Sequence, residues 1–141
     1  MRTRFDQELE ALHELLIEMG TLSQRAIEAA ATALEQQDPQ LAEKTHEYER
    51  QVDDCEKEVE RRCLKLLLQQ QPVATDLRRI STALKIITDL ERIADQACDI
   101  AEIAQRMASA PYIKKLIDIP EMGRAAIGMV RESIDAFVTG D

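Results

Sequence analysis

Apolar residues recur every three or four positions through most of the chain, which is the period of an amphipathic α-helix. The pattern predicts three long helices over residues 3–37, 39–70 and 73–108, which end at Asp38-Pro39, at Gln71-Pro72 and before Pro111. Pro39 and Pro72 are placed where a first helical turn tolerates proline, because a backbone N–H would be unpaired there anyway. Proline therefore marks the helix starts without breaking the pattern.

Links of only a few residues force neighbouring helices to run antiparallel. At a rise of about 1.5 Å per residue, the three helices are about 45–54 Å long. Hydrophobic residues make up 45% of the chain, but aromatic residues only 3%, and four glycines leave little material for hairpins. The predicted fold is an all-α, elongated antiparallel three-helix bundle with an additional C-terminal helix.

The C-terminal helix is predicted from about Pro120 to Gly140, after a linker over residues 111–119. Glu18-Met19-Gly20 recurs as Glu121-Met122-Gly123, and Asp38 recurs at the same offset as Asp141. Two interpretations stay open at this point. Either a second bundle begins here, or two amphipathic helices are merely alike.

The formal net charge of −9 disfavours nucleic acid and anionic lipid as partners, since both need a basic face. No apolar run reaches the roughly 18–20 residues that span a bilayer, and the charged N-terminus has no signal-peptide core. Cys55, Cys63 and Cys98 lie inside helical patterns. They are predicted to be buried thiols in a reducing compartment, which favours a cytoplasmic location.

Acidic residues form a stripe along each of two helices. On the third helix, an arc of about 80° holds Glu91, Asp95, Asp99 and Glu102. On the second, an arc of about 60° holds Glu49, Asp53, Glu56 and Glu60. Both stripes border the apolar arc, which is an unusual position for acids that are only solvated.

If the chain folds back at Pro72, residues equally distant from it lie side by side. Glu49 then lies level with Asp95, and Asp53 with Glu91. Converging carboxylates raise one another's pKa or require cations. An oxygen-rich site suits magnesium, manganese, iron, calcium or, less naturally, zinc. Alternatively, ordinary ion pairs could balance the stripes, formed with Arg50, Lys57, Arg61, Arg62, Arg78, Arg79, Lys85 and Arg92.

Glu10-x-x-His13 and Glu43-x-x-His46 have the Glu-x-x-His spacing that di-iron bundles use twice, so a di-iron site is a competing hypothesis. Measured from the first turn, the two histidines differ by about 25 Å along the bundle, so they cannot share one metal pair. Each is predicted to be a surface or helix-end residue. No glycine-rich phosphate loop and no Ser/His/Asp arrangement is found, so the chain is not expected to be an enzyme.

Two motifs carry a family resemblance. Gln71-Pro72-Val-Ala-Thr-Asp76-Leu77-Arg78-x-Ile80 and Leu84-Lys85-x-x-x-Asp89-Leu90-Glu91-Arg92-Ile93-x-Asp95 resemble the PhoU family of phosphate-transport accessory proteins. The N-terminal Arg-x-Arg-Phe-Asp-x-Glu-Leu and Val52-Asp53-x-x-Glu56-x-x-Val59-Glu60 are also similar to it. The resemblance covers nearly the whole chain.

The resemblance implies two tandem three-helix bundles, each with a Glu/Asp-x-x-x-Asp motif that can hold a metal cluster. Carried onto this chain, the motif falls on Glu91 and Asp95 and continues to Asp99, with Glu49 and Asp53 opposite. Iron, zinc, manganese or magnesium are the implied ions. This chain matches one repeat over residues 1–110 and only the first helix of another over residues 120–141, so one metal site is expected.

The resemblance also implies a role as negative regulator of the phosphate-starvation response. Such a regulator links the ATPase subunit of the phosphate ABC transporter to a sensor histidine kinase. It is cytoplasmic, reaches the membrane only peripherally through these partners, and forms a homodimer; here the apolar face of the last helix is expected to favour self-association. Two alternatives stay open: a di-iron or metal-storage bundle, and a structural helical module whose acids are solvated.

Overall fold

A computed structural model of the chain describes residues 2–69, 73–107 and 118–139. It contains α1 (Arg2–Gln36), α2 (Pro39–Gln69), α3 (Ala74–Met107) and α4 (Asp118–Thr139), and no strand among these residues. The predicted all-α fold is confirmed, with helix ends within two residues of those expected. The predicted linker lies mostly outside the described residues. None of the described helices has an apolar stretch long enough to span a bilayer.

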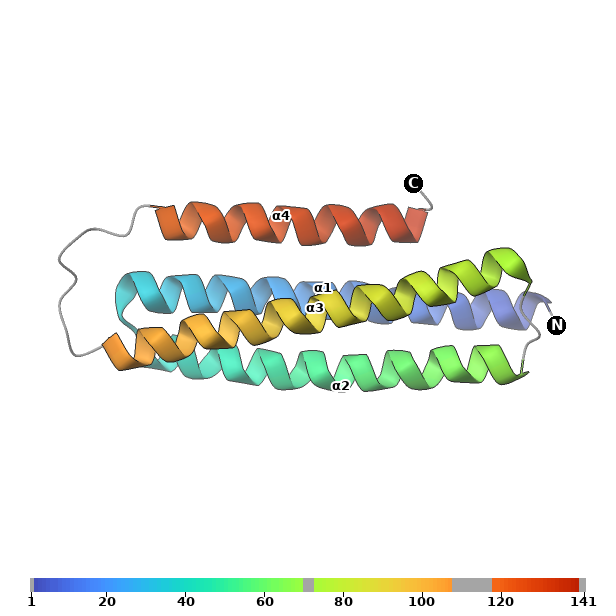
Figure 1. The fold of residues 1–141 in the computed structure, drawn as a ribbon, viewed down its shortest axis with the longest axis horizontal. Coiled ribbons are helices and arrows are strands. Elements are labelled where there is room, and N and C mark those ends of the chain that lie inside the picture. Colours follow the sequence, from blue (N-terminus) through green and yellow to red (C-terminus); the bar gives the residue numbers. More distant parts are fainter. Residues whose placement is uncertain (1, 70–72, 108–117, 140–141) are drawn as a thin grey trace.

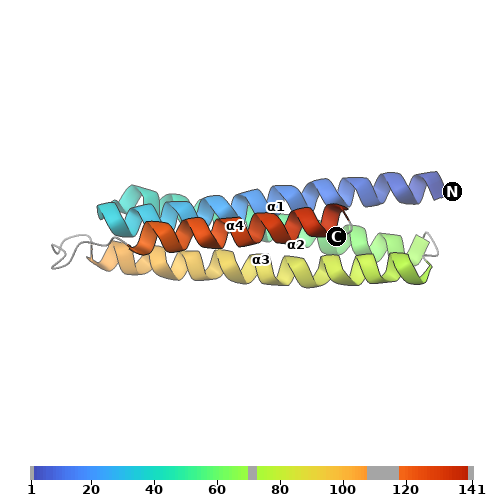
Figure 2. The same cartoon turned by 90° about the horizontal axis from the view of Figure 1, so that it is seen from above.

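The first three helices form an elongated antiparallel bundle, and α4 lies along its outside (Figure 1). Viewed from above, α4 runs over α1 and α3 and is antiparallel to both (Figure 2). α1 packs against each of the other three helices. It is therefore shared between the bundle and the added helix.

The turn between α1 and α2 shows why the first helix ends where the sequence predicts. Gln37 adopts a left-handed conformation, with φ of 54°, and the N–H of Asp38 donates to the carbonyl of Ala33 at 3.0 Å. Asp38 then caps α2, because its Oδ1 accepts the N–H groups of Gln40 at 2.9 Å and Leu41 at 3.4 Å. Pro39 occupies the first helical position, as predicted.

α3 begins with a cap of a different kind. The N–H of Val73 donates to Oδ2 of Asp76 at 3.2 Å, and the N–H of Leu77 donates to the Val73 carbonyl at 2.9 Å. The Asp76 side chain reaches back from the third helical position, as in one half of a capping box. Asp76 is only 3% exposed. Pro72, predicted to lie in this first turn, is outside the described residues.

The core changes character along the bundle. Large side chains fill it from the α2–α3 end to the middle, among them Phe5, Leu12, Leu16, Met19, Val52, Leu66, Ile80 and Ile87. Toward the α1–α2 turn the core consists of alanines, namely Ala26, Ala30, Ala33, Ala42, Ala97, Ala101 and Ala104. The three cysteines are buried and free, as the sequence predicts.

Helix α4 joins the core through α1. Val130 and Ile134 belong to the same buried cluster as the large side chains of the bundle. They lie over Gly20, where an added Cβ would be 3.1 Å from Cγ1 of Ile134. Arg131 adds a hydrogen bond from Nη2 to Oε1 of Gln24, at 3.1 Å. The absence of a side chain at Gly20 therefore allows the two helices to approach closely.

Candidate metal centre

The α2–α3 contact brings carboxylates of two helices together. Asp53 of α2 meets Glu91 and Asp95 of α3, and one side-chain oxygen from each lies within 4.8 Å of the others. Glu91 and Asp95 are one turn apart, so both project from the same side of α3. None of the three is buried, which leaves the group open to ions and water.

The other two residues of the predicted site lie at the edge of this group. Glu49 is one turn from Asp53 on α2 and interacts with Asp95. Asp99 is one turn beyond Asp95 on α3 and is exposed. Neither belongs to the set of three whose oxygens converge among the described residues. The structure thus places three of the five residues together, with the other two on adjacent turns.

The electrostatics of the group follow from its crowding. Partial burial, then a hydrogen bond and the negative charge of Asp95, raise the pKa of Glu91 to about 7. Burial also raises the pKa of Glu49, and the neighbouring Asp95 and Asp53 raise it further. Burial raises the pKa of Asp53 as well, and the charge of Asp95 adds to this rise. Glu56 has a raised pKa as well, first from burial and then from neighbouring acids. Negative charge is therefore less favourable on these four carboxylates than on exposed, isolated ones.

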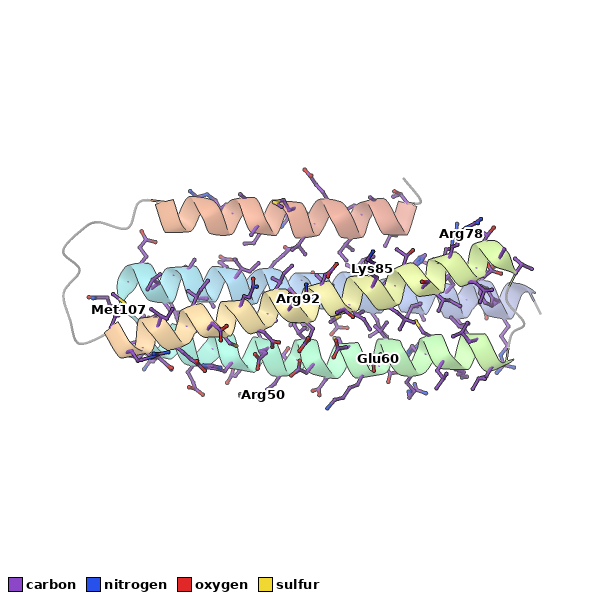
Figure 3. The ribbon with its side chains drawn as sticks, viewed as in Figure 1. Arg50, Glu60, Arg78, Lys85, Arg92 and Met107 are labelled. Carbon is purple, nitrogen blue, oxygen red and sulfur yellow. The ribbon has the colours of Figure 1, made fainter. Side chains whose placement is uncertain are left out.

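The described lysines and arginines do not form ion pairs with these acids. Among the described residues, no Lys or Arg nitrogen lies within 4.0 Å of the carboxylates of Glu49, Asp53, Glu91 or Asp95. Lys57 lowers the pKa of Asp53 only through its charge. Figure 3 shows Arg50 projecting from α2 away from α3.

Ordinary ion pairing is instead found at Glu58, which belongs to neither stripe. Its carboxylate binds Arg61 at 2.6 Å and Arg62 at 2.9 Å. Hydrogen bonds from these two arginines lower the pKa of Glu58 to about 2. The alternative in which nearby cations pair with the acids therefore describes Glu58, but not the group formed by Asp53, Glu91 and Asp95.

Two neighbours of the group were not among the predicted site residues. The thiol of Cys98 donates to the Thr45 carbonyl at 3.8 Å, and its hydrogen bonding to Glu49 opposes the rise in the pKa of that carboxyl. Glu56 lies near enough to Glu91 to raise its pKa. The sequence could have predicted the position of Cys98, because it follows Asp95 by three residues and so lies on the same side of α3.

The histidines take no part in the carboxylate group. His13 is buried at 9% exposure, so the prediction of a surface or helix-end position is wrong for this residue. Its pKa is lowered by burial, while the charges of Glu10 and Arg79 act in opposite directions. His46 is partly exposed in the second turn of α2, as expected. Neither Glu-x-x-His pair contributes to the group of three.

The arrangement suits cation binding. Three carboxylates provide oxygen ligands for a hard or borderline divalent ion, and water can complete its coordination because the group is open to solvent. A bound cation would offset the repulsion between these carboxylates, which adds to the effect of burial on the pKa of Glu91.

Comparison with known proteins identifies relatives across the chain. The sequence model of the family described as PhoU domain matches residues 16–104. A phosphate-specific transport system accessory protein PhoU homolog from Clostridium acetobutylicum is 39% identical over 138 residues, covering 97% of this chain and 63% of that protein. The PhoU protein of Escherichia coli is 31% identical, covering 98% of this chain and 57% of that protein.

A solved structure agrees with the sequence relatives. The crystal structure of PhoU from Pseudomonas aeruginosa superposes with a TM-score of 0.90 at 32% identity. The match covers 97% of this chain and 66% of that chain. The chain thus spans about three fifths of the length of the first curated relatives it matches.

Proposed function

Because the chain belongs to the PhoU family, we propose that it acts as a regulatory adaptor of phosphate uptake and of phosphate-starvation signalling. In this role it links the ATPase subunit of a phosphate ABC transporter to a sensor histidine kinase and restrains the starvation response. It does so in the cytoplasm, at the membrane only through these partners, and as a homodimer. The proposal assigns the chain no catalytic step. Its support is the name shared by relatives that match nearly the whole chain.

The carboxylate group supports a second part of the proposal, a metal site. Three acids from two helices converge with no cation of the protein within ion-pair distance among the described residues. Two charged acids in this position repel each other, so a divalent ion stabilises the contact by more than it would at a solvated surface. Asp53, Glu91 and Asp95 are the inner ligands, and Glu49 and Asp99 extend the site on adjacent turns.

The repeat organisation stays part of the proposal. Residues 1–110 form one PhoU-type repeat, residues 111–119 link it onward, and residues 120–141 correspond to the first helix of a second. The antiparallel packing of α4 on α1 through Val130 and Ile134 is compatible with a helix that begins a second bundle beside the first.

Metal binding is tested by calorimetric titration of the EDTA-treated chain with manganese, zinc, magnesium and, without oxygen, ferrous iron. We expect a stoichiometric complex with at least one ion, and loss of that complex in Glu91→Gln with Asp95→Asn. The control is Glu43→Gln with Asp89→Asn, which removes the same two kinds of acid at exposed positions, one on α2 and one on α3, outside the carboxylate group. A double variant that binds as tightly as the unaltered chain contradicts the site.

The adaptor role is tested separately by co-purification from cells grown with and without phosphate. We expect the transporter ATPase and the sensor kinase to be recovered with the full chain in a phosphate-dependent amount. If neither protein is recovered under either condition, the adaptor role is refuted, whatever the chain binds as metal.

A further inference from the structure

Helix α3 carries exposed apolar side chains in addition to those that it buries in the bundle. This α3 stripe consists of the half-buried Ile93, the exposed Gln96, and Ile100 (40% exposed), Ile103 (44%) and Met107 (39%). Figure 2 shows α3 along one edge of the molecule, with α4 between it and α1. Single exposed apolar residues need no explanation, but a row of them on one helix points to a contact surface.

The α3 stripe has the spacing of a seam between two helices. Ile93, Ile100 and Met107 are seven residues apart, and so are Gln96 and Ile103. The resulting steps of three and four residues are those of the core positions of a coiled coil. At about 100° per residue, the five positions span an arc of about 80°, centred about 100° from the buried alanines of α3. The stripe therefore suits a second helix laid along the outside of the bundle.

Two charges of opposite sign border the α3 stripe on the same edge. Asp99 and Arg106 are exposed and lie about 40° and 60° beyond Ile103 around the helix. Neither forms an ion pair with another of the described residues. Glu102 is the one other charged residue between positions 96 and 107, and it lies about 40° farther from the stripe than Arg106. A helix that covers the stripe thus meets one acid and one base along this edge.

We propose that the α3 stripe is the contact surface between two copies of this chain, with the two α3 helices antiparallel about a two-fold axis. In such a contact residue i meets residue j, and j meets i, so every pair occurs twice. When Ile100 lies opposite Ile103 of the second copy, Asp99 lies within two residues, or about 3 Å along the axis, of the second copy's Arg106. Each copy therefore supplies the cation for the acid of the other.

The inference rests on the proposed homodimer, to which it assigns a surface and a direction. A parallel two-fold contact would bring Asp99 against Asp99 and Arg106 against Arg106, and like charges repel. The α3 stripe also continues into a groove of about 490 Å³ between α3, α1 and α4, lined in part by Ile27, Leu34 and Met129. The groove extends the apolar surface beyond the α3 helix itself, and burial of that surface on association is favourable.

Sedimentation equilibrium of the full chain in EDTA measures self-association with no metal ion at Asp99 or between the copies. Ile100→Gln with Ile103→Gln is expected to raise the dissociation constant of the dimer roughly tenfold or more, because the centre of a contact carries most of its affinity. The matched control is Leu64→Gln with Leu68→Gln, two exposed apolar residues one turn apart near the end of α2. The control is expected to dimerise as the unaltered chain does.

A charge exchange tests the direction of the contact. Arg106→Glu and Asp99→Lys each place like charges opposite each other, so each variant alone is expected to dimerise roughly tenfold more weakly. When the two variants are mixed, both pairs again join opposite charges, one between the original residues and one between the introduced ones. The mixture is expected to approach the affinity of the unaltered chain. If it associates no more tightly than either variant alone, the antiparallel arrangement is refuted.

Every variant is first shown to be folded by its helical content and its melting curve. If the unaltered chain remains monomeric up to its solubility limit, the homodimer of the proposed function fails and this inference fails with it. If the unaltered chain dimerises and the isoleucine variant dimerises equally well, only the contact through the α3 stripe is refuted. If that variant keeps its dimer but no longer co-purifies a cellular protein, the stripe binds another protein and the proposal is overturned.

Discussion

The α1–α4 contact and the α2–α3 contact are built on opposite principles. Between α1 and α4, Val130 and Ile134 close over Gly20, and the hydrogen bond from Arg131 to Gln24 lies at the side. Between α2 and α3, the apolar core is bordered by Asp53, Glu91 and Asp95, with which no Lys or Arg of the described residues forms an ion pair. The first contact depends mainly on apolar packing, whereas the second depends on the ions and protons that the solution supplies. One bundle can thus have a helix contact whose stability is independent of ions and pH and another whose stability depends on both.

The largest effect is expected from a substitution that weakens the apolar contact between α1 and α4. Ile134 is 4% exposed, so Ile134→Ala removes buried methylene groups and leaves a cavity. We expect a loss of about 2–5 kcal/mol in the free energy of unfolding, as for other buried Ile→Ala changes. Denaturant titration at pH 5.5 and pH 8, with and without metal, should give the same loss. A loss that changes with pH or metal would show that the two contacts are coupled.

Added metal is expected to stabilise only the contact between α2 and α3. At a free-ion concentration of a hundred times Kd, binding stabilises a folded protein by about 2.7 kcal/mol. We expect this gain for the unaltered chain and none for Glu91→Gln with Asp95→Asn, measured as the shift in unfolding midpoint between manganese and EDTA. A similar gain in both proteins would place the ion elsewhere.

Proton binding gives a smaller effect of definite sign. The pKa of Glu91 is raised to about 7 in the folded chain from an ordinary value of 4.5, so the folded state holds a proton that the unfolded state has lost. The metal-free protein is therefore expected to lose stability as pH rises from about 5 to 8. Glu91→Gln should flatten this dependence in thermal melts.

Glu58 provides the control for this pH experiment. Its pKa is lowered to about 2, chiefly by hydrogen bonds from Arg61 and Arg62, so any stability it contributes is present above its ordinary pKa of 4.5. That contribution is lost only as pH falls toward 2. Glu58→Gln should therefore leave the slope between pH 5 and 8 unchanged.

The smallest predicted effect is a difference in stability between two Gly→Ala substitutions, at Gly128 and at Gly20. A Cβ at Gly128 meets nothing within 4 Å, so Gly128→Ala should stabilise the protein by up to about 1 kcal/mol through helix propensity. At Gly20 the added Cβ lies 3.1 Å from Cγ1 of Ile134, so Gly20→Ala should gain less. Paired denaturant titrations measure the difference. An equal gain at both positions would show that α4 is not held closely against α1.

Local signals in the sequence predicted the helices well. Asp38-Pro39 predicted the end of the first helix and placed Pro39 in the first turn of the next, and the structure has both; the N-cap formed by Asp38 was not predicted. Equal spacing about Pro72 predicted that Asp53 lies level with Glu91, and the two carboxylates do meet. Spacing along one axis does not give the direction of a side chain, however. For this reason it did not show that Asp53 reaches Asp95 while Glu49 remains at the edge.

What the sequence could not predict depends on contacts between helices. His13 was expected at the surface or at a helix end once a shared metal pair had been excluded, yet it is buried. The exposure of Leu68 and Val73 is the opposite case, because apolar character alone predicts burial. Burial at these positions depends on how the helices pack against one another, and helical periodicity contains no such information.

The close fit at Gly20 also has a consequence for folding kinetics. The contacts of α2 with α1 and with α3 join helices that follow one another along the chain, so short links close them at low entropic cost. The contact between Gly20 and Ile134 joins residues more than about a hundred positions apart, so its loop closure is more costly and its formation slower. We therefore expect α4 to be the last helix to dock and the first to detach, with amide hydrogens of α4 exchanging sooner than those of α1.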